Sequence, residues 1–314
     1  MRIKRYGKNL LVFLTLLFVT EVVLKLKWGF GSPVLFLEDT SFEYIAKPNQ
    51  GIKRFGNRIK TNEFSMRSEP ISASDSIVIL KIGDSIINGG TLTDQDSLAT
   101  TILEKKLREE FKKNIRVLNI SAGSWGPDNA FAYIKKYGAF KSKFFILVFS
   151  SHDLYDVMQF DKVVGVNPSF PSENPCCAIS ELVNRYGIPW LEEKTGISLH
   201  KDKIQNNFVI SYNTNKINPG WKEFIDYTRL NNIKLSVVLH PTIQEVEMQH
   251  YDENGKKIIS MLDSANIYCL KEINPSHIPL KDCYRDDIHY NNKGQKLLAE
   301  EVYPLLKDYI LGLR

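Results

Sequence analysis

The chain has few cysteines, and their spacing matches no zinc site. Its 314 residues include four, Cys176, Cys177, Cys269 and Cys283, without the CxxC or paired-histidine spacing of zinc ligands. Cys269 and Cys283 could close one loop near the end of the chain, whereas a bond between the adjacent Cys176 and Cys177 would be strained. One disulfide and four free thiols are both compatible with this pattern. We expect neither a metal ion nor another cofactor.

Beyond its first 27 residues, the chain has no excess of charge of either sign. The formal net charge is +5. Residues 1–27 carry six cations and one carboxylate, Glu21, which accounts for all of it. Nucleic-acid binding depends on a basic surface that neutralises phosphates, so the remaining chain has no electrostatic basis for it. Internal repeats and low-complexity tracts are also absent, and the sequence does not indicate an oligomeric state.

The first 30 residues combine this positive charge with a long apolar run from Leu10 to Leu24. A helix needs about 20 residues to cross a membrane, and extension to Phe30 supplies them if Lys25 and Lys27 reach outward. No small-x-small cleavage site follows, which favours an uncleaved signal-anchor over a cleaved signal peptide or a buried helix of a soluble protein. The cation-rich tip then stays in the cytoplasm and the rest is extracytoplasmic, either periplasmic or on the cell surface.

The remaining chain divides into a polar segment, 31–75, and a larger domain, 76–314. The first is expected to be a membrane-proximal linker with a hairpin turn at Gly56-Asn57. Its cations could meet an anionic polymer or lipid headgroups, although a hairpin packed beside the domain is the simpler interpretation. These cations are Lys53, Arg54, Arg58, Lys60 and Arg67.

The larger domain alternates apolar strands with amphipathic helices, which predicts an α/β fold with a parallel, doubly wound sheet. Continuous apolar runs, typical of strands buried on both faces, occupy 76–83, 115–121, 143–151, 233–241 and 265–270. Helices are expected at 97–114 with Asp96 or Ser97 as cap, from Pro127 to Tyr137, at 221–230 and from Asn291. Residues 155–218 interrupt this rhythm and are expected to form an insertion that covers one end of the sheet.

Reactive side chains follow these strands at their carboxyl ends. Ser85 follows the first strand directly, where a hydroxyl can be a nucleophile beside helix amides or an ordinary helix cap. Asp286 and His289 lie between the last strand and the final helix. A carboxylate three residues before an imidazole can hold Nδ1 and leave Nε2 as a general base. Asp287 fits this role less well.

Two further strand ends add polar groups. The turn after Asn119 contains Gly123 and Ser124, and His152 follows the third long strand. The stretch around Ser124 is a near miss to the G-x-S-x-G nucleophile elbow, because Ala122 replaces the first glycine. Ser124, paired with the same His289, is therefore an alternative nucleophile.

In these blocks the sequence resembles the SGNH/GDSL hydrolases, from about Ile77 to the C-terminus. Gly83-Asp84-Ser85 matches the first block, Asp286-x-x-His289 matches the last, and the turn after Asn119 resembles the second. His152-Asp153 stands where the third block has Asn-Asp. The resemblance implies a three-layer α/β/α sandwich with a flavodoxin-like parallel sheet. It also implies serine esterase or acyltransferase chemistry, with Ser85 as nucleophile, His289 as base and Asp286 orienting that base.

The resemblance also implies an oxyanion hole formed by the Ser85 amide, an amide of Gly123 or Ser124, and the side chain at position 152. A neutral imidazole has one N–H to donate, so His152 can replace the family's asparagine. The expected function is a serine ester hydrolase that removes acyl groups, such as acetyl, from an envelope glycan or lipid. The alternatives are an O-acyltransferase with the same triad and an inactive glycan-binding or assembly protein, in which His152 marks the loss of activity.

Overall fold

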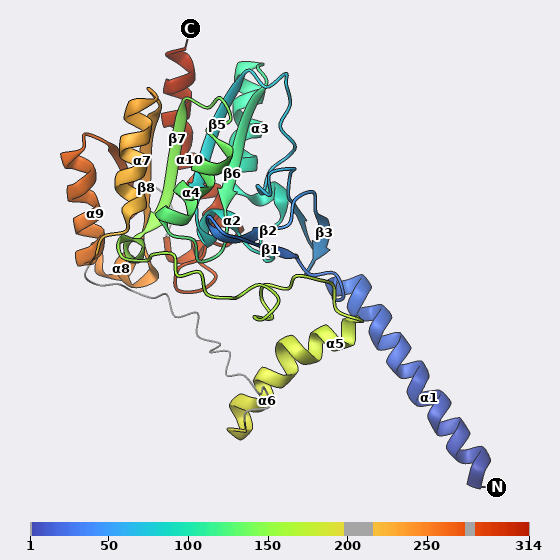
Figure 1. Cartoon of the computed structure of the whole chain (residues 1–314). Coiled ribbons are helices and arrows are strands. Elements are labelled where there is room, and N and C mark those ends of the chain that lie inside the picture. Colours follow the sequence, from blue (N-terminus) through green and yellow to red (C-terminus); the bar gives the residue numbers. More distant parts are fainter. Residues whose placement is uncertain (1, 198–215, 274–279, 314) are drawn as a thin grey trace.

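The computed structural model describes residues 2–197, 216–273 and 280–313 (Figure 1). At its centre is a parallel sheet of five strands in the order β6-β5-β7-β8-β9. The strands are β5 (Ile77–Gly83), β6 (Ile115–Ser121), β7 (Phe144–Ser150), β8 (Lys234–His240) and β9 (Tyr268–Lys271). This is the 2-1-3-4-5 order of flavodoxin-like sheets, and the predicted parallel, doubly wound sheet is confirmed.

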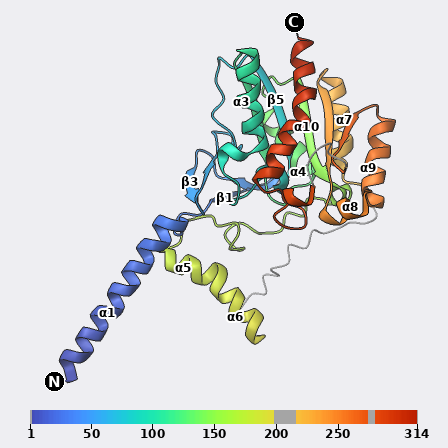
Figure 2. The ribbon, with the colours of Figure 1, turned by 180° about the vertical axis from the view of Figure 1, so that it is seen from behind.

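Helices cover both faces of this sheet and make the predicted three-layer sandwich. One face carries α3 (Ala99–Phe111) and α10 (Asn292–Leu311), seen in Figure 2, and the other carries α4 (Pro127–Tyr137), α7 (Pro219–Leu230) and α9 (Glu253–Ser264). Neighbouring strand residues point to opposite sides. In β5, Ile79 packs under α3 and α10, whereas Leu80 packs under α4. Because both faces are covered, the strands are mainly apolar, with a few buried polar residues such as Lys81 and Asn119.

The start of α3 differs from the sequence prediction. Asp96 and Ser97 do not cap this helix, which begins at Ala99. Leu98 occupies the cap position, and its side chain makes no capping hydrogen bond. Instead, the Asp94 side chain caps a preceding 3₁₀ turn, Gln95–Ser97. The Ala99 amide donates to Oε1 of Gln295 in α10 at 3.0 Å. The acceptor lies 196 residues away in the sequence, so no local pattern could reveal it.

The N-terminal helix α1 (Arg2–Val23) continues into a π-helical turn, Leu24–Trp28, and extends away from the body of the molecule (Figure 1). Its span Tyr6–Trp28 has 23 residues and contains an 18-residue window with a mean hydropathy of 2.0, enough by length and composition to cross a membrane, although a signal sequence has the same properties. Most of its apolar side chains are exposed, among them Leu10 and Phe13. The alternative of a buried core helix is therefore wrong.

Residues 31–75 pack against the domain. They form two antiparallel hairpins, β1 (Phe36–Asp39) with β2 (Glu43–Ala46), and β3 (Gly51–Arg54) with β4 (Asn57–Lys60). Phe42, Tyr44 and Met66 are buried in the same core as Trp125. The second turn consists of Phe55 and Gly56, both with positive φ (50° and 85°), which is one residue earlier than predicted. Positive φ at both turn residues matches the twist of the flanking strands.

Most of these cations have partners within the chain, which favours the simpler interpretation of a hairpin packed beside the domain, and contact with an anionic polymer or lipid headgroups stays a prediction. Arg54 is buried and forms an ion pair with Glu181. Arg67 is also buried and donates to backbone carbonyls. The two exposed ion pairs are Arg58 with Asp94 and Asp96, and Lys60 with Glu69.

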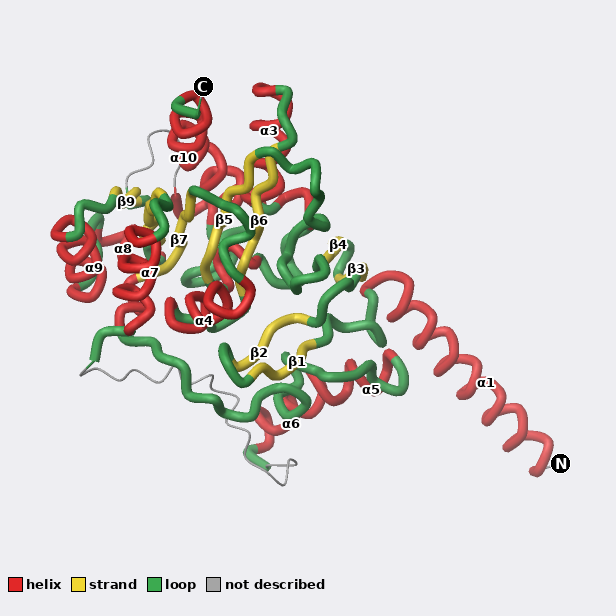
Figure 3. Tube along the Cα trace, turned by 45° about the horizontal axis from the view of Figure 1, so that its top comes forward, coloured by secondary structure: helices red, strands yellow, loops and turns green. Residues whose placement is uncertain are grey.

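The predicted insertion has two different parts. The loop around Phe170 lies against β1, where the Phe36 amide donates to the Pro171 carbonyl at 2.8 Å. The helices α5 (Ala178–Leu182) and α6 (Ile188–Thr195), joined by a π-helical turn, extend away from the sheet (Figure 3). Glu21 of α1 accepts hydrogen bonds from the first amides of α5, at 2.8 and 2.9 Å. Residues 198–215 of the insertion lie outside the described residues.

All four cysteines lie in the described chain, and each is a free thiol. The sulfurs of Cys176 and Cys177 are 3.8 Å apart. Cys283 is buried and Cys269 is half-buried. The disulfide that the sequence allowed between Cys269 and Cys283 is therefore absent.

Candidate active site

Three predicted residues meet at the carboxyl edge of the sheet. Ser85 is the first residue of the short helix α2 (Ser85–Asn88), directly after β5, whereas Asp286 and His289 lie in the loop before α10. The Ser85 hydroxyl lies 2.9 Å from His289 Nε2. On the other side of the ring, Nδ1 lies 2.9 and 3.0 Å from the two carboxylate oxygens of Asp286. Hydroxyl, imidazole and carboxylate thus form one line of hydrogen bonds.

The Asp286 carboxylate is held by its own loop. Oδ1 accepts from the amides of His289 at 2.7 Å and Ile288 at 3.1 Å. Partial burial acts to raise the pKa of Asp286, but these amides and the neighbouring imidazole outweigh it, and the pKa lies below its ordinary value. An ionised Asp286 fixes the proton on His289 Nδ1, so Nε2 is left as the acceptor for the Ser85 hydroxyl.

The His289 imidazole is suited to accept a proton near neutral pH. Burial lowers its pKa below the ordinary value of 6.5; Asp286 opposes this shift and the Arg285 guanidinium adds to it. The net effect is a neutral ring at pH 7. A general base must be unprotonated at the working pH, and His289 meets that condition.

Close packing fixes the turn that carries Ser85. Gly83 is the last residue of β5, and a side chain there would clash with the Val148 carbonyl of β7. Asp84 then caps α2, because its Oδ1 accepts from the Ile86 amide at 2.8 Å. The Gly-Asp-Ser order therefore serves the backbone as well as the chemistry: glycine for approach to β7, aspartate for the cap, and serine at the exposed edge.

Buried side chains bind the carbonyls of this turn, and no local sequence pattern indicated them. Asn119 Nδ2 donates to the Ile87 carbonyl at 2.8 Å, and Gln295 Nε2 donates to that of Ile86 at 2.6 Å. Arg67 donates to the carbonyls of Asn88, the last residue of α2, and of Gly90 and Thr93, which follow it. These donors come from β6, α10 and the N-terminal segment, so they were visible only once the chain had folded.

A second buried imidazole supports the loop that carries His289. His240, at the end of β8, has Nε2 at 2.7 Å from the Ile288 carbonyl and Nδ1 at 2.9 Å from Glu272 Oε2. Both side chains are fully buried. A carbonyl oxygen only accepts, so His240 Nε2 carries a proton. The same peptide unit donates its His289 amide to Asp286, which links Glu272 and His240 to the Asp286 carboxylate by continuous hydrogen bonds.

A pocket of about 260 Å³ opens beside Ser85 and His289 and is also lined by Ala122 and Gly123. Ser124 and His152 are not among the described residues that line it. Ser124 has a positive φ of 59° and a side chain hydrogen-bonded to Tyr44. His289 Nε2 contacts the Ser85 hydroxyl, so the alternative nucleophile Ser124 lacks the partner it requires.

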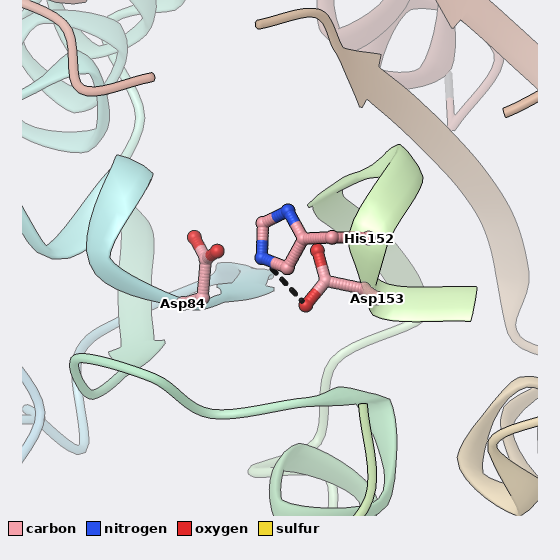
Figure 4. A group of neighbouring side chains, drawn as sticks. All are labelled: Asp84, His152 and Asp153. Carbon is pink, nitrogen blue, oxygen red and sulfur yellow. Dashed lines mark ion pairs between the residues drawn. The ribbon is translucent and has the colours of Figure 1, made fainter. Parts of the chain in front are cut away.

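His152 lies between two carboxyl groups (Figure 4). It belongs to the 3₁₀ turn Ser151–Leu154 after β7, and its Nε2 is 3.6 Å from Asp153 Oδ1. Burial lowers the pKa of His152. Burial also raises the pKa of Asp84 to about 7 and that of Asp153 to about 8, and each group is raised further by another carboxylate. His152 thus adjoins the residue before Ser85, and its role in an oxyanion hole stays a prediction.

The same three residues could hold a cation, since Asp84, His152 and Asp153 each place a ligand atom within 4.8 Å of the others. One oxygen of each carboxylate already accepts a backbone amide, that of Ile86 at 2.8 Å and that of Ser150 at 2.7 Å. The expectation that the chain needs no metal stays a prediction.

No family model and no curated protein matches this sequence. Among solved structures, the chain is similar to a lipase/acylhydrolase from Enterococcus faecalis, with a TM-score of 0.43 and 11% identity, over 74% of this chain and 96% of the other. It is similar to a lipolytic protein of the G-D-S-L family from Veillonella parvula, with a TM-score of 0.41 and 12% identity, over 74% and 99%. An acetyl-xylooligosaccharide esterase from Geobacillus has a TM-score of 0.41 and 14% identity, over 74% and 95%.

Proposed function

We propose that this chain is a serine ester hydrolase of the SGNH/GDSL type. The observation that carries the proposal is the line of hydrogen bonds from the Ser85 hydroxyl through His289 to Asp286. It lies at the carboxyl edge of a flavodoxin-like sheet, where open α/β proteins bind their ligands. A pocket opens directly beside Ser85 and His289, so a substrate can reach the hydroxyl.

In the proposed reaction, His289 Nε2 takes the proton of Ser85 while Oγ attacks the acyl carbon of an ester. The tetrahedral intermediate collapses, the bond from carbon to the alcohol oxygen breaks, and His289 returns the proton to that oxygen. Water then attacks the acyl carbon while His289 takes its proton, the bond from this carbon to Ser85 Oγ breaks, and His289 returns the proton to Oγ as the acid leaves. Asp286 remains ionised and stabilises the imidazolium that forms in each half of the reaction.

The oxyanion of the intermediate needs donors close to Ser85. The Ser85 amide at the start of α2 and the Gly123 amide are the proposed backbone donors, because Ser85 and Gly123 both line the pocket. His152 is the proposed side-chain donor, in the place of the family's asparagine.

The substrate is proposed to be an acyl group, such as acetyl, on a glycan or lipid of the cell envelope. The apolar helix at Tyr6–Trp28 would anchor the protein with its domain outside the cytoplasm. Transfer to another hydroxyl uses the same acyl-serine, so the acceptor that enters the pocket decides between hydrolysis and O-acyl transfer.

The first prediction concerns the nucleophile. The full chain in detergent reacts with a fluorophosphonate probe, and Ser85→Ala abolishes the labelling because the hydroxyl activated by His289 is lost. Ser124→Ala is the matched control and labels like the wild type. Unlabelled wild type, or equal labelling of Ser85→Ala, would contradict the proposal and favour an inactive binding protein. Release of acetate from p-nitrophenyl acetate, with and without a sugar acceptor, then separates hydrolysis from transfer.

The pH profile provides the second prediction. The base must be neutral, so kcat/KM for p-nitrophenyl acetate rises with pH as His289 loses its proton. Since the pKa of His289 is lowered from 6.5, the midpoint of this rise lies below pH 6.5. Arg285→Gln removes a positive charge that lowers this pKa and moves the midpoint to higher pH. Arg229→Gln, on α7, is the control; a wild-type midpoint above 6.5 would disprove the assignment.

The third prediction tests His152. Losing one oxyanion donor costs about 10²–10³-fold in kcat, so His152→Ala is expected to reduce kcat by about 100-fold with little change in KM. His152→Asn restores most of the rate, because an asparagine amide can donate in its place. The control is His250→Ala, which changes an exposed histidine. Full activity of His152→Ala would remove this residue from the oxyanion hole.

The fourth prediction concerns His240, which positions the catalytic loop. His240→Gln leaves Glu272 without its imidazole partner and loosens the Ile288 carbonyl. We expect kcat to fall by about tenfold, which corresponds to about 1.4 kcal/mol in the barrier, while KM is unchanged. Kinetics with p-nitrophenyl acetate measure both, with His250→Gln as control. If KM rose and kcat stayed constant, the role in positioning would be wrong.

A further inference from the structure

The pocket beside Ser85 is lined by positive and neutral residues. Its described lining includes three arginines, Arg67, Arg185 and Arg285, and no aspartate or glutamate. Hydroxyl and amide groups supply the other polar contacts, and the apolar wall comes from Val34, Phe36, Ile59 and Phe170. The three guanidinium groups belong to different parts of the chain, namely the N-terminal segment, the insertion and the catalytic loop.

Two of these arginines, Arg67 and Arg285, are close enough for the charge of Arg285 to lower the pKa of Arg67. Arg67 is buried, and burial lowers its pKa to about 9; Asp94 opposes this shift and Arg285 adds to it. The hydrogen bonds of Arg67 go to backbone carbonyls, so it contributes charge to the pocket while holding the Ser85 turn. Arg285 donates to the Gly89 carbonyl at 3.1 Å and keeps only a loose contact with Asp286, at 3.7 Å.

The third cation is also incompletely neutralised. Arg185 lies 3.9 Å from Glu181 Oε1, at the limit of an ion pair. The Glu181 carboxylate is already held by the buried Arg54 and by the Gly31 amide. Likewise, the Asp286 carboxylate already accepts hydrogen bonds from the His289 ring and from two backbone amides. The carboxylates nearest the pocket therefore have other partners, and the charged side chains that line the pocket itself are arginines.

We infer that this pocket selects esters whose alcohol portion carries a negative charge, a carboxylate or a phosphate. The inference rests on the proposed function and specifies its substrate. Like charges that line one pocket repel each other unless an anion enters, and a guanidinium binds carboxylate and phosphate through paired hydrogen bonds.

The anion belongs on the alcohol because of the position of His289. In the proposed reaction, Nε2 gives its proton to the leaving oxygen, so the leaving group lies on the imidazole side of Ser85. Arg285 precedes Asp286 in the same loop and faces the same pocket as His289. A group attached to the leaving oxygen therefore reaches Arg285, and Arg185 across the pocket, while apolar parts contact Phe36 and Phe170.

The test compares two acetyl esters that differ in charge on the alcohol, 4-acetoxybenzoate and 4-acetoxybenzamide. The full chain in detergent is expected to prefer the benzoate in kcat/KM by about tenfold or more, the range for one hydrogen bond to a charged group. The preference shrinks as NaCl is raised from about 50 to about 500 mM, because salt screens the attraction. Equal rates for the two esters would overturn the inference while leaving the proposed hydrolase intact.

Arginine variants identify the residues that cause the preference for the benzoate. Arg285→Gln and Arg185→Gln each reduce the ratio of the two rates, whereas Arg285→Lys keeps most of it. The ratio cancels any general loss of activity from a disturbed Ser85 turn. Arg229→Gln, at the end of α7 and bonded to the Ala265 carbonyl, is the matched control and leaves the ratio unchanged. Unchanged ratios in both pocket variants would overturn the assignment.

Two further measurements separate the alcohol side of the ester from its acyl side, and binding from turnover. Mono-p-nitrophenyl succinate and p-nitrophenyl butyrate place the charge difference on the acyl group, and a preference confined to that pair would overturn the alcohol-side inference. Binding of the two acetoxy esters to Ser85→Ala, followed by ligand-observed NMR, needs no turnover. Tighter binding of the benzoate, lost in Ser85→Ala/Arg185→Gln, supports the anion site even if the chain proves catalytically inactive. Equal binding would refute it.

Discussion

The hydrogen bond between the Ser85 hydroxyl and His289 Nε2 joins residues 204 positions apart, and the surrounding structure is arranged to hold its two ends. A parallel sheet brings every strand's carboxyl end to one edge, so Ser85 after β5 and His289 after β9 reach the same place. Topology alone sets this only to within a few ångströms. The remaining precision comes from buried polar side chains that fix the backbone on each side.

The two ends are fixed by different means. On the serine side, Arg67, Asn119 and Gln295 bind carbonyls in and after α2, so the turn cannot shift without leaving buried donors unpaired. On the histidine side, His240 Nε2 binds the Ile288 carbonyl, and Glu272 holds the other nitrogen of the same ring. An unpaired buried group costs about 1–3 kcal/mol, so both supports resist small displacements.

Local pattern was sufficient for the sheet, the order of helices and strands, and the three residues that meet. Strands buried on both faces are continuous apolar runs, and Asp286 and His289 are neighbours along one loop. Local pattern was insufficient where a supporting polar side chain comes from a distant part of the chain. Gln295 replaces the expected cap of α3, and Arg54 and Arg67 are buried although their segment looked like a solvated linker. His240 and Glu272, each on its own unremarkable, form a site only through the pairing of β8 with β9.

The pocket is formed jointly by the segment 31–75 and the domain. Its walls come from residues 34–67, from the insertion at 169–185 and from the domain itself, so no single part encloses a substrate. Glu21 of α1 caps α5, and Arg54 of the β3–β4 hairpin binds Glu181 of the same short helix. The outer end of the apolar N-terminal helix is therefore tied, through α5, to the turn that carries Arg185. If the helix spans a membrane as proposed, this coupling would fix the orientation of the pocket relative to the membrane surface.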